Sequence, residues 1–202
     1  MSGAAQPVAD ATPGAVPAAP TTFTTDPSIA AFKQTLRAYL DAHPEPEGIT
    51  LDGIAVSAFV FNPEGKLLLV QRAVHDSMPE KWEVPGGASD FEDGSLLHAV
   101  VRELWEESGL RATAVGKAIA VDDRFTTKRR NLQMRKFSFM VSVEGYHVKL
   151  DDNEHQKFSW VSEDEARVRR CGDIDLDYTD LAQEQAIHLA FEMRKAEAQM
   201  EA

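Results

Sequence analysis

The chain has 202 residues, and its 33 Asp and Glu side chains outnumber its 21 Lys and Arg side chains, giving a formal net charge of −12. This balance argues against a protein that coats long nucleic acids, because a polyanion would be repelled overall. The single cysteine, Cys171, excludes an intrachain disulfide, a CxxC redox pair and a cysteine-rich zinc site. No apolar run approaches the roughly 18 residues of a membrane span. No leader-like segment precedes Lys33, the first basic residue, so we expect a cytoplasmic protein.

The first 48 residues are expected to lie outside the main domain. Residues 1–25 are rich in Ala, Pro and Thr and carry one charged side chain, so they predict a disordered tail. Residues 26–48 predict a helix followed by a linker. Asp26 precedes Pro27 as a cap precedes the first helical position, and apolar residues follow at helical spacing as far as residue 42.

Residues 49–202 predict one domain in which strands and helices mix. The turn at residues 62–65, Asn-Pro-Glu-Gly, separates two apolar runs and predicts a hairpin. Residues 95–108 predict a helix that Gly109 ends in a left-handed conformation. Because no regular βαβ alternation is visible, we expect a mixed sheet flanked by helices. The expected strands are 54–61, 66–71, 82–84, 112–122, 132–143 and 157–161, with a capping box at Ser162 and Glu165 and a final helix over 180–200.

The helix over 95–108 carries the most informative side chains of the sequence. At about 100° per residue, Glu103, Glu106 and Glu107 fall within one arc, and the apolar residues of the helix fall on a different stripe. Such a face is often merely solvated, but three clustered carboxylates repel one another. A divalent cation would relieve that repulsion, and Mg²⁺ suits a few carboxylates combined with substrate phosphates.

At this helix the sequence resembles the Nudix hydrolase family, whose signature is G-x5-E-x7-R-E-U-x-E-E-x-G-U, where U is a bulky aliphatic residue. Residues 102–110, Arg-Glu-Leu-Trp-Glu-Glu-Ser-Gly-Leu, match its second half in full. In the first half, Gly86 is followed by Glu92 at the right spacing, but Glu92 stands too far before Arg102. Starting from Gly87 places Asp93 at the acidic position with one residue too many. We interpret this as a one-residue insertion in the loop 88–94, which leaves Glu92 and Asp93 as alternatives.

The resemblance implies a fold, a cofactor and roles for individual residues. It implies an α+β fold, an α/β/α sandwich with a mixed, strongly twisted sheet, and a dependence on Mg²⁺ that Mn²⁺ can replace. Arg102 matches the residue that orients a glutamate by a salt bridge. A further acid outside the signature often binds the metal or acts as the base, and Glu154 is the best candidate, with its neighbour His155 as another possible base. The implied metal ligands are Gly86, through its carbonyl, and Glu103, Glu106, Glu107 and Glu154.

Substrate binding is expected from side chains beyond the signature. Residues 124–136 carry six basic and no acidic side chains, and the family often places a substrate-facing arginine where Arg72 stands. We take Arg72, Arg124, Phe125 and Lys128 as candidate substrate contacts. The Pro and Tyr markers typical of ADP-ribose and diadenosine-polyphosphate enzymes are missing after the signature. The expected substrate is therefore a nucleoside triphosphate or another nucleoside diphosphate derivative, hydrolysed at its diphosphate linkage by a metal-activated water.

Two other functions remain compatible with such a fold. A non-catalytic module that senses nucleotides would typically have lost the glutamates that this chain keeps. An isoprenoid-diphosphate isomerase would rely on a core cysteine, whereas Cys171 lies beyond the predicted strands. Apart from a small-molecule diphosphate we expect no membrane and no long nucleic acid as partner, and the protein as a monomer or homodimer.

Overall fold

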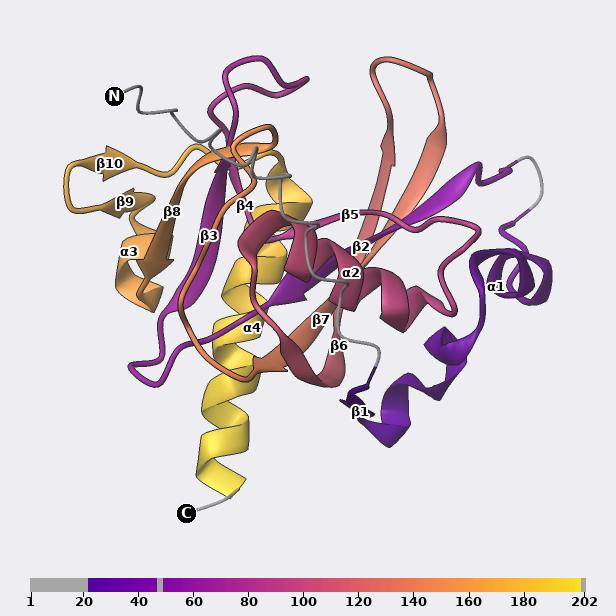
Figure 1. Ribbon diagram of the computed structural model, residues 1–202, viewed down its shortest axis with the longest axis horizontal. Helices are drawn as coiled ribbons and strands as arrows, with labels where there is room; N and C mark the ends of the chain where they lie inside the picture. Colours follow the sequence, from indigo (N-terminus) through magenta and orange to yellow (C-terminus); the bar gives the residue numbers. More distant parts are fainter. Residues whose placement is uncertain (1–21, 47–48, 201–202) are drawn as a thin grey trace, which may run out of the picture.

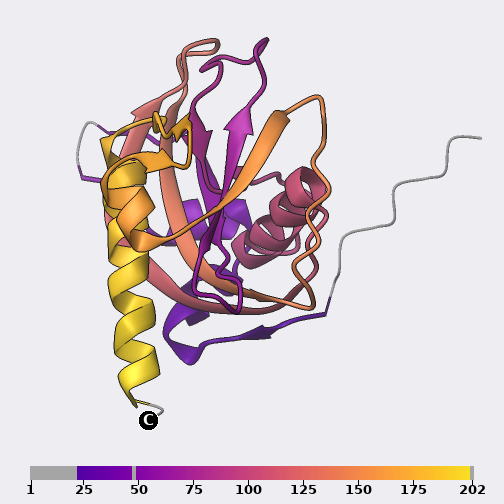
Figure 2. The same ribbon diagram turned by 90° about the vertical axis from the view of Figure 1, so that its left-hand side faces the viewer.

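The computed structural model describes residues 22–46 and 49–200, which form two main sheets between helices and a separate two-stranded pair, β9 with β10 (Figures 1 and 2). In chain order the elements are β1 (Thr24–Thr25), the 3₁₀ helix η1 (Pro27–Lys33), α1 (Leu36–Ala42), β2 (Gly53–Phe59), β3 (Leu67–Arg72), β4 (Trp82–Glu83), β5 (Gly86–Ala88), α2 (Leu96–Ser108), β6 (Ala112–Thr126), β7 (Gln133–Val143), β8 (His155–Val161), α3 (Glu163–Arg167), β9 (Arg170–Cys171), β10 (Ile174–Asp175) and α4 (Leu181–Met200). No helix in this described part of the chain is long and apolar enough to cross a membrane.

The larger sheet is mixed, as the sequence predicts. Its order is β1-β6-β7-β2-β5, in which β1 runs parallel to β6 and β2 parallel to β7, and the remaining pairs are antiparallel. A smaller antiparallel sheet has the order β4-β3-β8. Figure 2 shows the strands between α2 on one side and α4 on the other, which is the expected α/β/α sandwich.

Two apolar cores fill the spaces between these layers. Successive side chains of a strand point to opposite faces, so the long strands β2, β3, β6, β7 and β8 contribute side chains to both cores. On β3, Leu68 packs with α2 in the first core, while Leu67 and Leu69 pack with α4 in the second. Ile187 and Phe191 anchor α4 against the second core. Each sheet is therefore buried on both faces, which fixes its register.

The expected hairpin at residues 54–71 is correct only at its turn. The Asn62 amide donates to the Lys66 carbonyl at 2.9 Å, and the Asn62 side chain accepts from the Lys66 amide at 2.9 Å. Beyond the bridge between Phe61 and Leu67, β2 pairs with β5 and β7, and β3 pairs with β4 and β8. The two strands thus leave a local turn to join different sheets.

The segment before residue 46 differs from expectation in two ways. Thr24 and Thr25 form β1 against β6, so these two residues belong to the folded protein, and residues 1–21 of the expected tail lie outside the described residues. The expected helix over 27–42 is two helices, because Gln34 adopts an extended conformation between η1 and α1. The Gln34 carbonyl there accepts from the Leu96 amide, the first of α2, at 2.9 Å. Rings of this segment, those of Phe32 and Tyr39, pack on Phe137 of β7.

Candidate active site

Helix α2 begins and ends where its capping residues direct. The Ser95 hydroxyl accepts from the His98 amide, and Gly109 ends the helix at φ 67°, a conformation that favours glycine. The apolar residues of the helix other than Trp105 are buried in the first core. This packing turns the opposite face, with its three glutamates, toward β5 and the start of β8.

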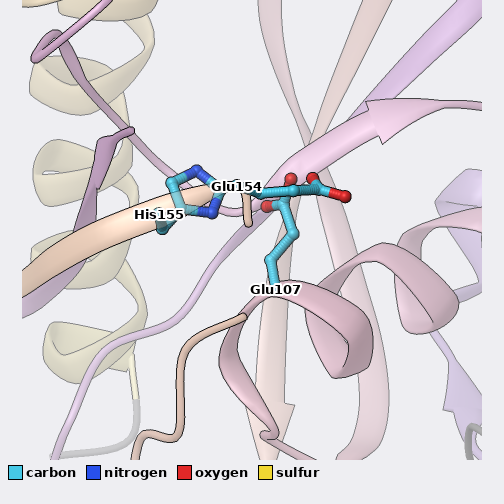
Figure 3. Close-up of side chains that lie close together, drawn as sticks. All are labelled: Glu107, Glu154 and His155. Atoms are coloured by element: carbon cyan, nitrogen blue, oxygen red, sulfur yellow. The ribbon is translucent and has the colours of Figure 1, made fainter. Parts of the chain in front are cut away.

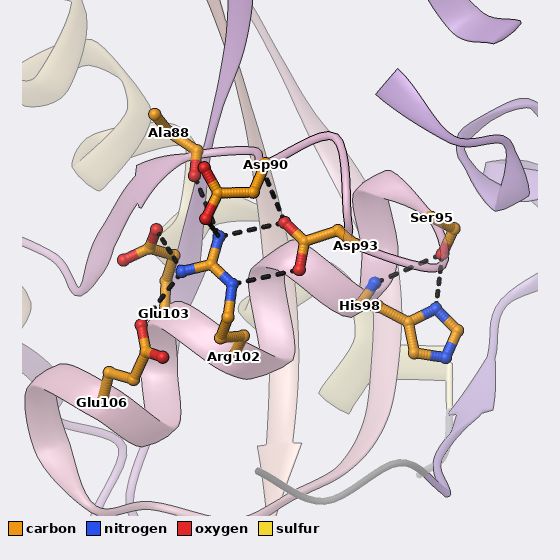
Figure 4. A network of polar contacts seen from close by, with 8 residues as sticks. All are labelled: Ala88, Asp90, Asp93, Ser95, His98, Arg102, Glu103 and Glu106. Carbon is orange, nitrogen blue, oxygen red and sulfur yellow. Dashed lines mark hydrogen bonds and ion pairs between the residues drawn. The ribbon is translucent and has the colours of Figure 1, made fainter. Parts of the chain in front are cut away.

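Arg102 is the centre of a polar network on that face (Figure 4). Its guanidinium donates to both carboxylate oxygens of Asp93, at 3.0 and 2.9 Å, and to the Ala88 carbonyl at 3.0 Å. It also donates to Glu103 at 2.8 Å and to Glu106 at 2.9 Å. Because Asp93 makes the bidentate contact and Glu92 is exposed, Asp93 occupies the acidic position of the signature. The inserted residue is absorbed in the loop and leaves the network intact.

Two glycines let the chain pass close to the glutamates. The Gly86 amide donates to the Glu107 carboxylate at 2.7 Å. A Cβ on Gly86 would lie 2.3 Å from the Val56 carbonyl oxygen, and a Cβ on Gly87 would lie 2.6 Å from the Glu103 carboxylate. Backbone atoms leave no room for a side chain at Gly86, and a side chain at Gly87 would displace the Glu103 carboxylate, so β5 approaches α2 with its backbone.

Glu154 and His155 reach the same place from the start of β8 (Figure 3). One ligand atom from each of Glu107, Glu154 and His155 lies within 4.8 Å of the other two, a grouping that could hold a metal ion. Glu107 and His155 are buried, whereas Glu154 is exposed. The signature glutamates, Glu154 and His155 together line a cavity of about 320 Å³.

Carboxylate side chains outnumber arginines in the lining of the cavity. Burial raises the pKa of Glu103 to about 7 against the opposing effect of Arg102, and Glu106 and Glu154 add to the rise. Burial, reinforced by the charge of Glu83, also raises the pKa of Glu107 well above its usual range. A buried carboxylate resists ionisation unless a cation compensates it. The oxygen donors and their mutual repulsion therefore fit a hard divalent cation.

The comparisons with known proteins agree with this geometry. The model of the NUDIX domain matches residues 51–181. The chain belongs to the Nudix family. It is 35% identical over 113 residues to the CTP pyrophosphohydrolase of Escherichia coli K12, covering 56% of this chain and 78% of that protein. It is 31% identical over 109 residues to the RNA pyrophosphohydrolase of Psychrobacter sp. PRwf-1, covering 51% and 60%.

A solved structure shows the same fold. The MutT protein of Methanosarcina mazei Go1 superposes with a TM-score of 0.57 and 25% identity, over 72% of this chain and 99% of that chain. Given the full match of residues 102–110 to the second half of the signature and these relatives, the chain is a Nudix-type pyrophosphohydrolase. The NUDIX range excludes residues 22–46 and nearly all of α4, although both pack on the domain.

A second, less polar pocket of about 460 Å³ adjoins the acidic cavity of this Nudix enzyme. Arg72 and the segment Gly86–Ala88 line both. Phe125 and Lys128 line the second pocket, as expected of substrate contacts, and Lys136 sits 5.8 Å over the Phe125 ring. Its other walls include Met78, Val84, Met134, Thr179 and Asp180, which the sequence did not single out.

Arg124 does not reach that pocket. Neighbouring residues on a strand point to opposite faces, so Arg124 lies on the far side of β6 from Phe125. There it pairs with Glu45 at 2.9 Å and with Asp122 at 3.1 Å. Arg124 is thus not among the residues that line this pocket, and its expected role as a direct substrate contact stays a prediction.

Sequence reasoning also missed Glu83. This buried residue of β4 forms an ion pair with Arg72, which also pairs with Asp76 at 2.6 Å. Burial lowers the pKa of Arg72, but the charges of Glu83 and Asp76 outweigh that effect and raise it. Arg72 therefore stays a fixed cation at the boundary of the two pockets. Nothing in the sequence marks Glu83, because it lies between Trp82 and Val84 in a stretch typical of core.

Proposed function

We propose that this enzyme hydrolyses the diphosphate linkage of a nucleoside triphosphate, or of another nucleoside diphosphate derivative, with Mg²⁺ as cofactor and Mn²⁺ as a possible substitute. The supporting observation is the pair of adjoining pockets. One is lined by carboxylates and suits a metal-bound diphosphate, and the other is largely apolar and suits a nucleoside. Arg72 lies where the two meet, as a phosphate ligand should.

The cation would be held by Glu103, Glu106, Glu107 and Glu154 together with the Gly86 carbonyl. When bound, it would supply positive charge to the diphosphate and lower the pKa of a water molecule. Arg102 keeps Glu103 and Glu106 in place through its two bonds at 2.8 and 2.9 Å. The Gly86 amide does the same for Glu107, so the carboxylates are oriented before a ligand arrives.

Glu154 is the proposed proton acceptor. It is the exposed member of the group with Glu107 and His155, so water can approach it. A carboxylate at such a position can take a proton from an attacking water. Nε2 of His155 lies 3.5 Å from Glu83 in a buried setting, which favours a supporting role for this ring beside Glu83 over a role as the base.

The second pocket supports a nucleoside as the other end of the substrate. The Phe125 ring offers an apolar face to a base, and Lys128 and Lys136 place positive charge near the phosphates. The relative named CTP pyrophosphohydrolase makes nucleoside triphosphates the first compounds to test. Discrimination between bases falls to the pocket, since the acidic cavity contacts only the diphosphate.

A substrate panel tests the proposal. Purified protein is incubated with Mg²⁺ and ribo- and deoxynucleoside triphosphates, nucleotide sugars, ADP-ribose and diadenosine polyphosphates, and released phosphate and pyrophosphate are measured. We expect one nucleoside triphosphate to be hydrolysed best, with activity lost in EDTA and restored by Mg²⁺ or Mn²⁺. Full turnover in excess chelator would contradict the metal dependence, and hydrolysis of nucleotide sugars alone would reassign the substrate.

A further inference from the structure

Glu45 lies outside the NUDIX range, in the stretch between α1 and β2, yet its side chain is only 5% exposed. Its two carboxylate oxygens are each bound by a different arginine. Oε2 pairs with Arg124 of β6 at 2.9 Å, and Oε1 pairs with Arg135 of β7 at 2.9 Å. One buried carboxylate thus joins two strands.

The two arginines face each other across the sheet. Arg124 and Arg135 are direct partners in the antiparallel register of β6 and β7. Like charges directly opposite each other in a strand pair destabilise it. Asp122 offers a second carboxylate, at 3.1 Å from Arg124 and 3.8 Å from Arg135, but its side chain is 62% exposed. Glu45 is the better shielded of the two and supplies the shorter contacts, so we infer that it holds this end of the strand pair together.

The opposite face of the same strand pair is the wall of the second pocket. Phe125 and Met134, the next partners in register, line that pocket, as does Lys136. Beyond them the turn at residues 127–132 carries Lys128 and Arg129, which also line it. Any separation of Arg124 from Arg135 would therefore move the pocket wall on the other side of the sheet.

We propose that Glu45 is a positioning residue for substrate binding, acting through Arg124 and Arg135 on the pocket wall formed by Phe125 and Met134. The proposal rests on the proposed function in that the second pocket must receive substrate. It gives the residues before the NUDIX range a part in binding, although none of residues 22–46 lines that pocket.

Glu45→Gln tests the proposal, with Glu64→Gln as the matched control. Glu64 is exposed in the turn after β2, at the end of that strand remote from Arg135. Losing the charge on Glu45 should raise KM by about fivefold to tenfold, within the range of coupling between contacting residues, while kcat stays within about twofold of wild type. Glu64→Gln should leave both constants unchanged.

The double variant Glu45→Gln with Arg124→Gln separates positioning from mere destabilisation. Replacing Arg124 also removes the repulsion between the two arginines across the strands. The KM of the double variant should therefore return most of the way to the wild-type value. If Arg124 instead bound substrate itself, Arg124→Gln alone would raise KM, and the KM of the double variant would stay raised. That result would overturn the proposal, as would an unchanged KM in Glu45→Gln.

Amide hydrogen exchange of the substrate-free protein gives a measurement that needs no activity. Glu45→Gln should speed exchange in residues 124–126 and 133–135, and the double variant should slow it again. Unchanged exchange would overturn the proposed clamp even if the enzyme proved active. Should the substrate panel show no hydrolysis, the proposed function would fail, while faster exchange reversed in the double variant would still support the clamp.

Discussion

The acidic cavity and the second pocket share a wall but are built in opposite ways. The cavity draws three glutamates from α2, of which Arg102 holds Glu103 and Glu106, and the Gly86 amide holds Glu107. The pocket collects its lining from several strands, the loop after β3, the β6–β7 turn and the residues before α4. A change in the cavity should therefore affect the chemical step, and a change in the pocket should affect which substrate is held and how tightly.

The strongest test of this division is Glu107→Gln. It should lower kcat by at least about 100-fold, the scale of losing a principal electrostatic element, and change KM much less. Steady-state kinetics on the best compound of the panel gives both constants. A variant that kept more than about half of the wild-type kcat would remove Glu107 from the proposed metal site.

The same variant should remain folded. Burial raises the pKa of Glu107, so its ionised form is disfavoured in the folded protein, and glutamine can still accept the Gly86 amide. We expect a metal-free melting temperature equal to or above that of wild type. Mg²⁺ should raise the wild-type value more than that of the variant, because only a ligand bound to the folded state stabilises it.

Glu154→Gln, a second change in the acidic cavity, should lower kcat less than Glu107→Gln does. Glu154 is exposed and is not part of α2, so we expect kcat to fall about tenfold, which corresponds to about 1.4 kcal/mol of transition-state stabilisation. Stopped assays over a range of pH would show whether the acidic limb of the profile changes. An unaltered kcat would assign proton transfer to another acid.

Lys128→Ala, a change in the second pocket, should have the smallest kinetic effect of these variants. Lys128 is exposed and lines the pocket, so its loss should raise KM about threefold and leave kcat unchanged, in keeping with the modest strength of exposed ionic contacts. The difference from wild type should shrink as salt is added. Steady-state kinetics at two salt concentrations measures this difference. A fall in kcat instead would contradict the assignment of the chemical step to the cavity and of substrate binding to the pocket.

The two regions also differ in how far the sequence predicts them. Glu103, Glu106 and Glu107 lie on one helix, where spacing along the chain fixes spacing in space. The choice between Glu92 and Asp93 stayed open because counting residues does not reveal the path of a loop. Glu154 was inferred from its place before a strand, and the structure brings it to the cavity.

The pocket could be predicted only in part because its contacts are non-local. The basic segment drew attention to Phe125 and Lys128, and both line the second pocket. Composition alone could not show that Arg124, directly before Phe125 in sequence, lies on the other face of the strand and pairs with Glu45. In the same way, turn chemistry predicted the bend at residues 62–65, but pairing with distant strands decided that β2 and β3 separate.

The segment that precedes the NUDIX range also bears on where this protein can be cut. The Gln34 carbonyl caps the first amide of α2, and the rings of Phe32 and Tyr39 cover Phe137. A fragment that began at residue 51 would start α2 with an unsatisfied amide and present aromatic rings of β7 to water. Such a surface favours self-association. The matched NUDIX range is thus shorter than the part of the chain that packs together, and we expect well-folded fragments of this chain to begin before β1.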